Sequence, residues 1–144
     1  MPQFVHQSRF DVSPETLFAF HERDDIFHLL LPPWRKVHVV SRTGGLKAGA
    51  RVEFRILLGP FYKTWVAVHT EYEHNRLFTD EQQAGPFAYW RHRHIFQPDG
   101  DGCILRDEIQ YELPLGLDPL LGWLVEKDLR RMFQYRHEST AQNC

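Results

Sequence analysis

Cysteine and long apolar runs are both scarce in this chain. Two of its 144 residues are cysteines, Cys103 in a strand-like run and Cys144 at the last position. Two such cysteines do not make a disulfide framework, so a reducing, cytoplasmic location is expected. No segment reaches the roughly 18 apolar residues that span a bilayer, and residues 1–6 lack both the basic and the apolar part of a secretion signal.

Charge of one sign is lacking as well. The chain has 17 Lys and Arg against 19 Asp and Glu, a net charge of −2. This balance gives no overall attraction to nucleic acid or to an anionic membrane, so neither is expected as a partner. Repeats, low-complexity tracts and linker-like stretches are also missing, and residues 1–144 are predicted to form a single domain. The chain is rich in aromatic residues, with 11 Phe, 5 Tyr and 4 Trp. They fill either a very aromatic core or the wall of a cavity.

The order of apolar patterns predicts an α+β fold. Strands are expected at residues 4–12, 36–42, 50–58, 61–73, 76–84, 87–97 and 103–113, with two short helices between residues 14 and 31. The connections are short and rich in glycine and proline, which favours a consecutive antiparallel meander. A long final helix is expected with Asp118 as its N-cap and Pro119 at its first position. Its apolar stripe comprises Leu121, Leu124, Val125, Leu129, Met132 and Phe133.

This order of elements, together with an ordered set of short motifs, resembles the START/SRPBCC superfamily over nearly the whole chain, and within it the small bacterial ligand-binding proteins. The motifs are Leu31-Pro32-Pro33-Trp34, Gly49 before a strand, Gly59-Pro60 followed by Trp65, Asp80-Glu81-Gln82, Gly85-Pro86-Phe87, Trp90-x-His92-x-His94-x-Phe96, Tyr111-Glu112-Leu113-Pro114 and Phe133-x-Tyr135-Arg136. The resemblance implies a helix-grip fold, in which a curved antiparallel sheet wraps around the C-terminal helix and two short helices follow the first strand. It also implies a ligand cavity between sheet and helix. It names no substrate, because the superfamily has many functions.

Strand alternation indicates which side chains face inward. In residues 87–97 the arginines Arg91 and Arg93 belong in water, so the opposite parity is assigned to the interior. The inward sets are Trp90, His92, His94 and Phe96 on this strand, and Cys103, Leu105, Asp107, Ile109, Tyr111 and Leu113 on the next. In residues 61–73, Trp65, Ala67 and His69 are the favoured inward set, with Val66 and Val68 as the alternative.

The hairpin between the last two strands determines which inward residues meet. A turn centred near Asp99-Gly100 predicts that Phe96 lies opposite Cys103, His94 opposite Leu105 and His92 opposite Asp107. An inward carboxylate opposite an inward imidazole would form a hydrogen-bonded pair.

The leading hypothesis is that the protein binds a small hydrophobic or aromatic molecule. The predicted ligand-binding residues are Trp65, His69, Phe78, Trp90, His92, His94, Phe96, Asp107, Ile109, Tyr111, Leu121, Val125 and Leu129. Rings and aliphatic groups would supply the wall, and His69, His92, His94 and Asp107 the few oriented polar contacts.

Two alternatives remain open at this point. A polyketide cyclase- or dehydratase-like enzyme would use His92 or His94 as the acid or base, with Asp107 orienting it. A protein-interaction or regulatory module would need an exposed apolar patch near Trp34 or Trp123, and Trp123 is also the candidate surface for a homodimer. Zinc bound by His92 and His94 with His69 or Asp107 is geometrically conceivable, but the chain lacks a second ligand pair of recognisable spacing, so no metal or cofactor is expected.

Overall fold

The computed structural model describes residues 2–144 and contains one seven-stranded antiparallel sheet. Its strands are β1 (Gln3–Phe10), β2 (Val37–Thr43), β3 (Arg51–Leu58), β4 (Phe61–Glu73), β5 (Leu77–Ala84), β6 (Tyr89–Asp99) and β7 (Gly102–Glu112). Their order across the sheet is β1-β7-β6-β5-β4-β3-β2. The meander predicted from the short connections therefore runs from β2 to β7, and β1 is added beside β7.

Two short helices follow β1, and a long helix ends the chain. Helix α1 spans Pro14–His21 and α2 spans Ile26–Leu30. Ser13 caps α1, because its hydroxyl accepts a hydrogen bond from the Thr16 N–H at 3.1 Å. A single 3-10 turn, η1 (Pro114–Gly116), leads into α3 (Asp118–Asn143).

The predicted N-cap of α3 is wrong. Leu117 holds the cap position, and Asp118 is already inside the helix. The Asp118 carboxylate instead accepts a hydrogen bond from the Leu113 N–H at 3.2 Å. This contact ties the start of α3 to the residue that follows β7.

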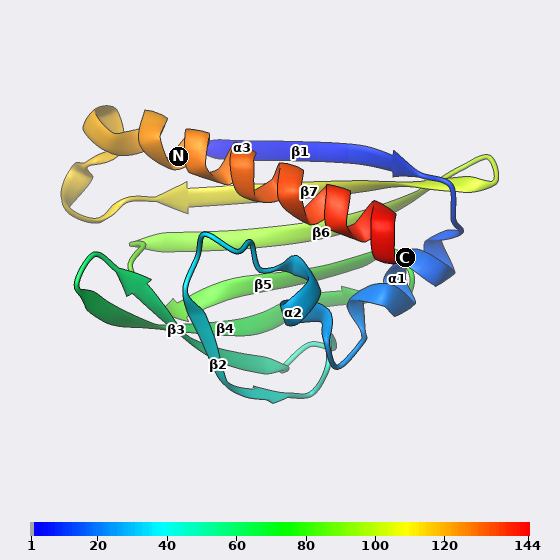
Figure 1. The fold of residues 1–144 in the computed structure, drawn as a ribbon, viewed down its shortest axis with the longest axis horizontal. Coiled ribbons are helices and arrows are strands. Elements are labelled where there is room, and N and C mark those ends of the chain that lie inside the picture. Colours follow the sequence, from blue (N-terminus) through cyan, green and yellow to red (C-terminus); the bar gives the residue numbers. More distant parts are fainter. Residues whose placement is uncertain (1) are drawn as a thin grey trace.

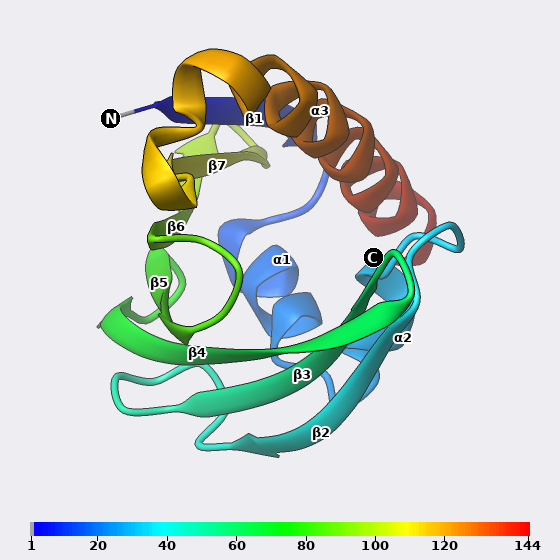
Figure 2. The same ribbon diagram turned by 90° about the vertical axis from the view of Figure 1, so that its left-hand side faces the viewer.

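The sheet curves strongly, and α3 lies across its concave side (Figures 1 and 2). Figure 2 shows β1 and β7 at one end of the curve and β2 and β3 at the other, with α1 and α2 between them. The predicted α+β helix-grip architecture is confirmed. No helix within residues 2–144 combines the length and the apolar character needed to cross a membrane.

The register of the β6–β7 hairpin differs from the prediction by two residues. Observed partners are Phe96 with Leu105, His94 with Asp107 and His92 with Ile109. The reason is the turn: Asp99 pairs with Gly102, so only Gly100 and Asp101 lie outside the ladder. A slip of two residues keeps each side chain on its own face. The predicted inward residues of both strands are therefore inward in the structure, with different partners.

The buried apolar side chains form two clusters. The first contains Phe10, Leu17, Phe18, Leu46, Phe78, Phe96, Cys103 and Leu105, and the second Phe4, Trp90, Ile109, Tyr111, Leu129 and Phe133. Helix α1 contributes Leu17 and Phe18 to the first, and α3 contributes Leu129 and Phe133 to the second. Each cluster thus packs one helix against the sheet. The part of the concave surface that neither helix covers borders a cavity.

Candidate ligand cavity and its buried histidine cluster

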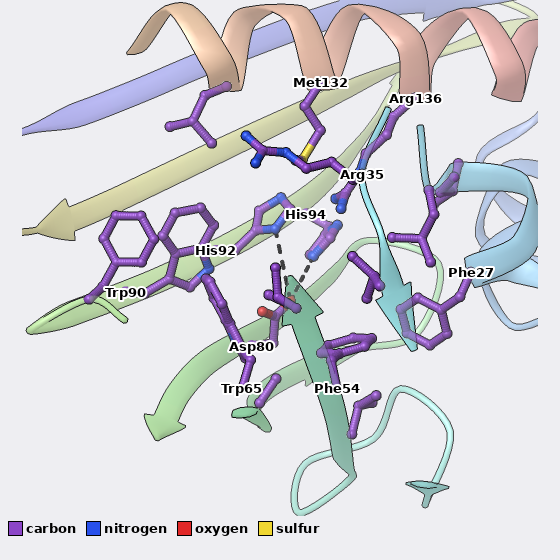
Figure 3. A pocket seen from close by; sticks show the side chains of 18 of the residues that line it. Phe27, Arg35, Phe54, Trp65, Asp80, Trp90, His92, His94, Met132 and Arg136 are labelled. Atoms are coloured by element: carbon purple, nitrogen blue, oxygen red, sulfur yellow. Dashed lines mark hydrogen bonds and ion pairs between the residues drawn. The ribbon is translucent and has the colours of Figure 1, made fainter. Parts of the chain in front are cut away.

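A cavity of about 670 Å³ lies between α3, α2 and the concave face of β2–β6. Aromatic and aliphatic side chains form most of its wall, including Phe27, Phe54, Trp65 and Trp90 (Figure 3). The edges of Trp65 and Trp90 meet at nearly a right angle, with ring centroids 5.0 Å apart. Such edge-to-face packing fixes both rings and gives the cavity a rigid aromatic corner.

Eight of the thirteen predicted binding residues line this cavity: Trp65, His69, Phe78, Trp90, His92, His94, Val125 and Leu129. The other five do not, namely Phe96, Asp107, Ile109, Tyr111 and Leu121. Their expected place in the wall is corrected by the way the helices pack.

Helix α3 packs against β1, and its apolar side chains also cover the inward side chains of the neighbouring β7. Ile109 and Tyr111 are buried against Leu129 and Phe133 in the second core cluster. Phe96 is buried in the cluster that α1 covers. At the start of α3, Leu121 is half-buried outside the cavity, while Leu124 and Val125, which follow it, reach the wall.

Asp107 is the hub of a buried polar cluster behind the cavity wall. Its side chain accepts hydrogen bonds from His92 Nε2 at 2.7 Å and from His137 Nε2 at 2.6 Å, one on each oxygen. The second nitrogen of His137 lies 2.8 Å from the Ser8 hydroxyl. This chain of contacts joins β1, β6, β7 and α3. It satisfies polar groups that would be costly to bury alone.

His94 lies between two carboxylates. Its Nε2 is 2.9 Å from Asp80 Oδ2, and its Nδ1 is 3.2 Å from Asp107 Oδ1. Its ring also stacks on those of Phe78 and His92, with centroids 3.9 and 3.6 Å away. Because a carboxylate oxygen only accepts, both nitrogens of His94 are placed to donate, which is the geometry of the charged imidazolium.

Burial and hydrogen bonding shift the pKa values of the two neighbouring histidines, His92 and His94, in opposite directions. Burial lowers the pKa of His94, but the hydrogen bonds to Asp107 and Asp80 outweigh it and raise the pKa above 6.5. For His92, burial and the neighbouring His94 charge prevail, and its pKa is lowered. Burial acts to raise the pKa of both acids, yet the imidazole donors win: the pKa of Asp80 falls to about 2 and that of Asp107 well below 3.8. The cluster therefore favours a proton on His94 over one on His92, beside two ionised carboxylates.

Two other histidines line the cavity from elsewhere. His21, on α1, donates from Nδ1 to the Leu17 carbonyl at 2.8 Å, and burial lowers its pKa to about 4. His69 donates in the same way to the Leu46 carbonyl at 2.9 Å, and burial also lowers its pKa. With Nδ1 donating, each ring keeps an acceptor nitrogen at Nε2.

The ligand atoms of Asp80, His92 and His94 lie within 4.8 Å of one another, as metal ligands would. Figure 3 shows the three side chains converging at the cavity wall. Both nitrogens of His94 nevertheless face carboxylates, and His92 gives its Nε2–H to Asp107, so among the four imidazole nitrogens only His92 Nδ1 offers a free lone pair. A metal would have to displace the proton that this environment stabilises.

Sequence reasoning missed the charged side chains at the cavity wall and four polar residues closest to the buried cluster or unpaired in the cavity. His21, Asp80 and Arg136 line the cavity, and His137 supports the cluster from α3. Asp80 has a signal in the sequence, since strand alternation over residues 76–84 places it on the same face as Phe78. His137 and Arg136 follow the apolar stripe of α3 in a polar stretch that reads as a solvated surface.

The tryptophans considered for interaction surfaces lie outside the core. Trp34 is 37% exposed and packs edge-on against Tyr135, with the Arg131 guanidinium 4.0 Å from its ring. Trp123 is 64% exposed near the start of α3, close in sequence to the exposed Leu120. An interaction through either residue, including a homodimer, stays a prediction.

A model of the family described as "Polyketide cyclase / dehydrase and lipid transport" matches residues 10–135. This chain belongs to that family. The START-related resemblance of the sequence is thereby confirmed. A search of curated protein sequences finds no significant match.

Solved structures share the fold of this polyketide cyclase/dehydrase family member at low sequence identity. A START superfamily protein from Mycobacterium smegmatis is 16% identical with a TM-score of 0.69, covering 97% of this chain and 94% of that one. TTHA0849 from Thermus thermophilus is 18% identical with a TM-score of 0.75, covering 98% and 95%. Norcoclaurine synthase from Thalictrum flavum is 12% identical with a TM-score of 0.71, covering 98% and 84%. At these identities the likeness extends to the fold alone.

Proposed function

We propose that this protein binds a small hydrophobic molecule in the cavity between the sheet and α3. The observation that carries the proposal is the cavity itself, about 670 Å³ with a mostly apolar wall and a few convergent polar groups. Pockets for small organic ligands typically enclose about 300–1,000 Å³ and have this composition. Membership of a family described by polyketide cyclisation and lipid transport supports the same class of ligand.

A titration with 1-pyrenebutanol, a neutral apolar probe, tests the proposal. Trp65 and Trp90 line the cavity, so energy transfer from tryptophan to pyrene reports binding there. Ala67, 5% exposed on the cavity face of β4, is the site for a blocking substitution, Ala67→Phe. Thr64→Phe, at an exposed position of the same strand, is the matched control.

Saturable binding in the micromolar range is expected, weakened at least about tenfold by Ala67→Phe and unchanged by Thr64→Phe. The physical reason is that the added ring occupies space which the probe needs. Absence of saturable binding, or equal binding by the two variants, would contradict the proposal.

The cluster supports a second candidate function, proton transfer on the bound molecule. His92 is neutral, lines the cavity and donates Nε2–H to the ionised Asp107, which leaves a lone pair on Nδ1. Among residues 2–144 no hydrogen-bond donor contacts this nitrogen, and its nearest ionic neighbour is Asp80 at 4.0 Å. A neutral imidazole oriented by a carboxylate is a general base.

The base-promoted ring opening of 5-nitrobenzisoxazole measures this property directly. The base removes the C3 proton while the N–O bond breaks, and the product is a coloured cyanophenolate. The wild type is expected to exceed free imidazole in rate, and His92→Gln to lose that excess, while His74→Gln, at an exposed histidine, keeps it. A rate equal to that of free imidazole, or one insensitive to His92→Gln, would remove this second function.

A further inference from the structure

Arg136 is a cationic side chain inside the cavity without an anionic partner. It reaches from α3 into the pocket (Figure 3), where its guanidinium lies over the Phe133 ring at 5.0 Å. Its Nε is buried and has no hydrogen-bond partner among residues 2–144. The side chain as a whole is partly buried, and burial lowers its pKa, although arginine remains protonated at neutral pH.

The other two arginines with a buried, unbonded Nε are neutralised by carboxylates. Arg35 forms an ion pair with Asp128, and Arg93 lies 3.3 Å from Glu71 on the outer face of the sheet. No carboxylate of residues 2–144 lies within 4.0 Å of Arg136. Burying an unpaired guanidinium is costly, so an unfilled position beside it is the feature that needs an explanation.

The nearest buried acids do not fill that position. Asp80 and Asp107 stabilise the charge of Arg136 only from a distance. Asp80 is hydrogen-bonded to His94, and both oxygens of Asp107 are taken by imidazole donors. The donors of Arg136 therefore remain free to bind a group that enters the cavity.

The other charged side chains that line the cavity are also mainly cationic. Five cationic side chains line the cavity against two acidic ones: Arg35, Arg42, Lys127, Arg131 and Arg136, against Asp80 and Asp128. This excess occurs in a chain whose net charge is −2. A cleft with cationic walls of low dielectric attracts anions from solution.

We propose that the ligand of this cavity carries a carboxylate and that Arg136 binds it, with the apolar body of the ligand against Trp65 and Trp90. The proposal rests on the hydrophobic-ligand function above and specifies the class of molecule. A planar guanidinium can donate two parallel N–H···O bonds to a carboxylate, and this geometry discriminates the acid from its alcohol.

The test compares 1-pyrenebutyrate with 1-pyrenebutanol, which have the same apolar body and differ in the head group. Both are titrated into the wild type, Arg136→Met and Arg136→Lys. Arg130→Met, on the solvent face of the same helix where Arg130 pairs with Glu126, is the matched control. Thermal unfolding of each ligand-free variant reports whether it folds.

The wild type is expected to bind 1-pyrenebutyrate at least about tenfold more tightly than 1-pyrenebutanol. Arg136→Met should remove this preference and leave binding of the alcohol unchanged, Arg136→Lys should keep part of it, and Arg130→Met should keep all of it. Arg136→Met should unfold at or above the wild-type temperature, because it removes an unpaired buried charge.

Equal affinity of the wild type for both probes, or a preference that survives Arg136→Met, would overturn the carboxylate proposal while leaving the hydrophobic-ligand function intact. Failure of both probes to bind would overturn the two together. If Arg136→Met does not fold, the Arg136→Lys variant decides: an undiminished preference for the acid would refute the bidentate contact.

Discussion

Asp107→Asn is the substitution that examines the buried cluster most directly. The side chain keeps its shape, but one acceptor oxygen becomes an NH₂ donor facing imidazole N–H groups. Asp107 is 3% exposed and accepts hydrogen bonds from His92 and His137, with His94 Nδ1 at 3.2 Å. Removing one partner of a buried, hydrogen-bonded ion pair costs about 3–5 kcal/mol. Since the asparagine keeps one acceptor, a loss of about 3 kcal/mol in the free energy of unfolding at pH 7 is expected.

Urea unfolding followed by tryptophan fluorescence measures that loss. Glu108→Gln is the control on the same strand and the opposite face, where Glu108 pairs with Arg106 at 2.8 Å. That pair is partly exposed, so its loss should cost about 1 kcal/mol or less. Histidine ring NMR supplies a second readout: the pKa of His94 should fall in Asp107→Asn, because one of its two carboxylates has gone.

The pH dependence gives a third readout. The pKa of Asp107 is lowered in the folded protein, so its stabilisation is complete above the ordinary pKa of 3.8 and is lost as the pH falls further. The difference between wild type and Asp107→Asn should therefore shrink below about pH 4. A loss no larger than that of Glu108→Gln, with the pKa of His94 unmoved, would refute the view of Asp107 as the hub.

Three further predictions concern stability and reactivity. The pKa of His21 falls from 6.5 to about 4 on folding, so the free energy of unfolding should drop by about 3 kcal/mol as the pH falls from 6.5 toward 4. His21→Phe should flatten this decline, and an unchanged slope would contradict the burial of a neutral His21. A Cβ on Gly102 would lie 2.6 Å from the Phe10 carbonyl, so Gly102→Ala should cost about 1–3 kcal/mol in urea unfolding. Cys103 is fully buried and burial raises its pKa to about 11, so a thiol-specific aromatic disulfide reagent should modify only the exposed Cys144 until the protein unfolds.

The faces of the strands could be predicted because alternation does not depend on register. Arg91 and Arg93 identified the outer face of β6, and that assignment tolerated a two-residue error in the hairpin. The partners of His92 and His94 could not be predicted, because moving the two-residue turn by one position along the chain decides which of them pairs with Asp107. The family resemblance supplied the architecture, and the cavity's position depended on packing.

The C-terminal half of helix α3 could not be assigned to the interior from hydrophobic periodicity. Its apolar stripe stops at Phe133, yet the helix continues to Asn143 and buries His137, Ser139 and Thr140. Hydrophobic periodicity finds a buried face only where that face is apolar. Here the last turns bury polar groups, some of them bonded to partners far away in the sequence, as His137 is to Asp107 and Ser139 to the Leu29 carbonyl. Arg136 belongs to the same stretch, so its interior position has no signal in the pattern.

The place of β1 in the sheet has a consequence for synthesis. In the register Gln3 pairs with Gln110, so the first strand leaves the ribosome long before its only neighbour exists. Pairings so distant in sequence are slow to form, because the loop between them must be ordered first. Until residues 118–143 are made, only the short helices α1 and α2 lie against the concave face, and the wall of the cavity that α3 supplies is missing. The cavity can therefore be complete only once residues 118–143 have been translated and α3 has docked.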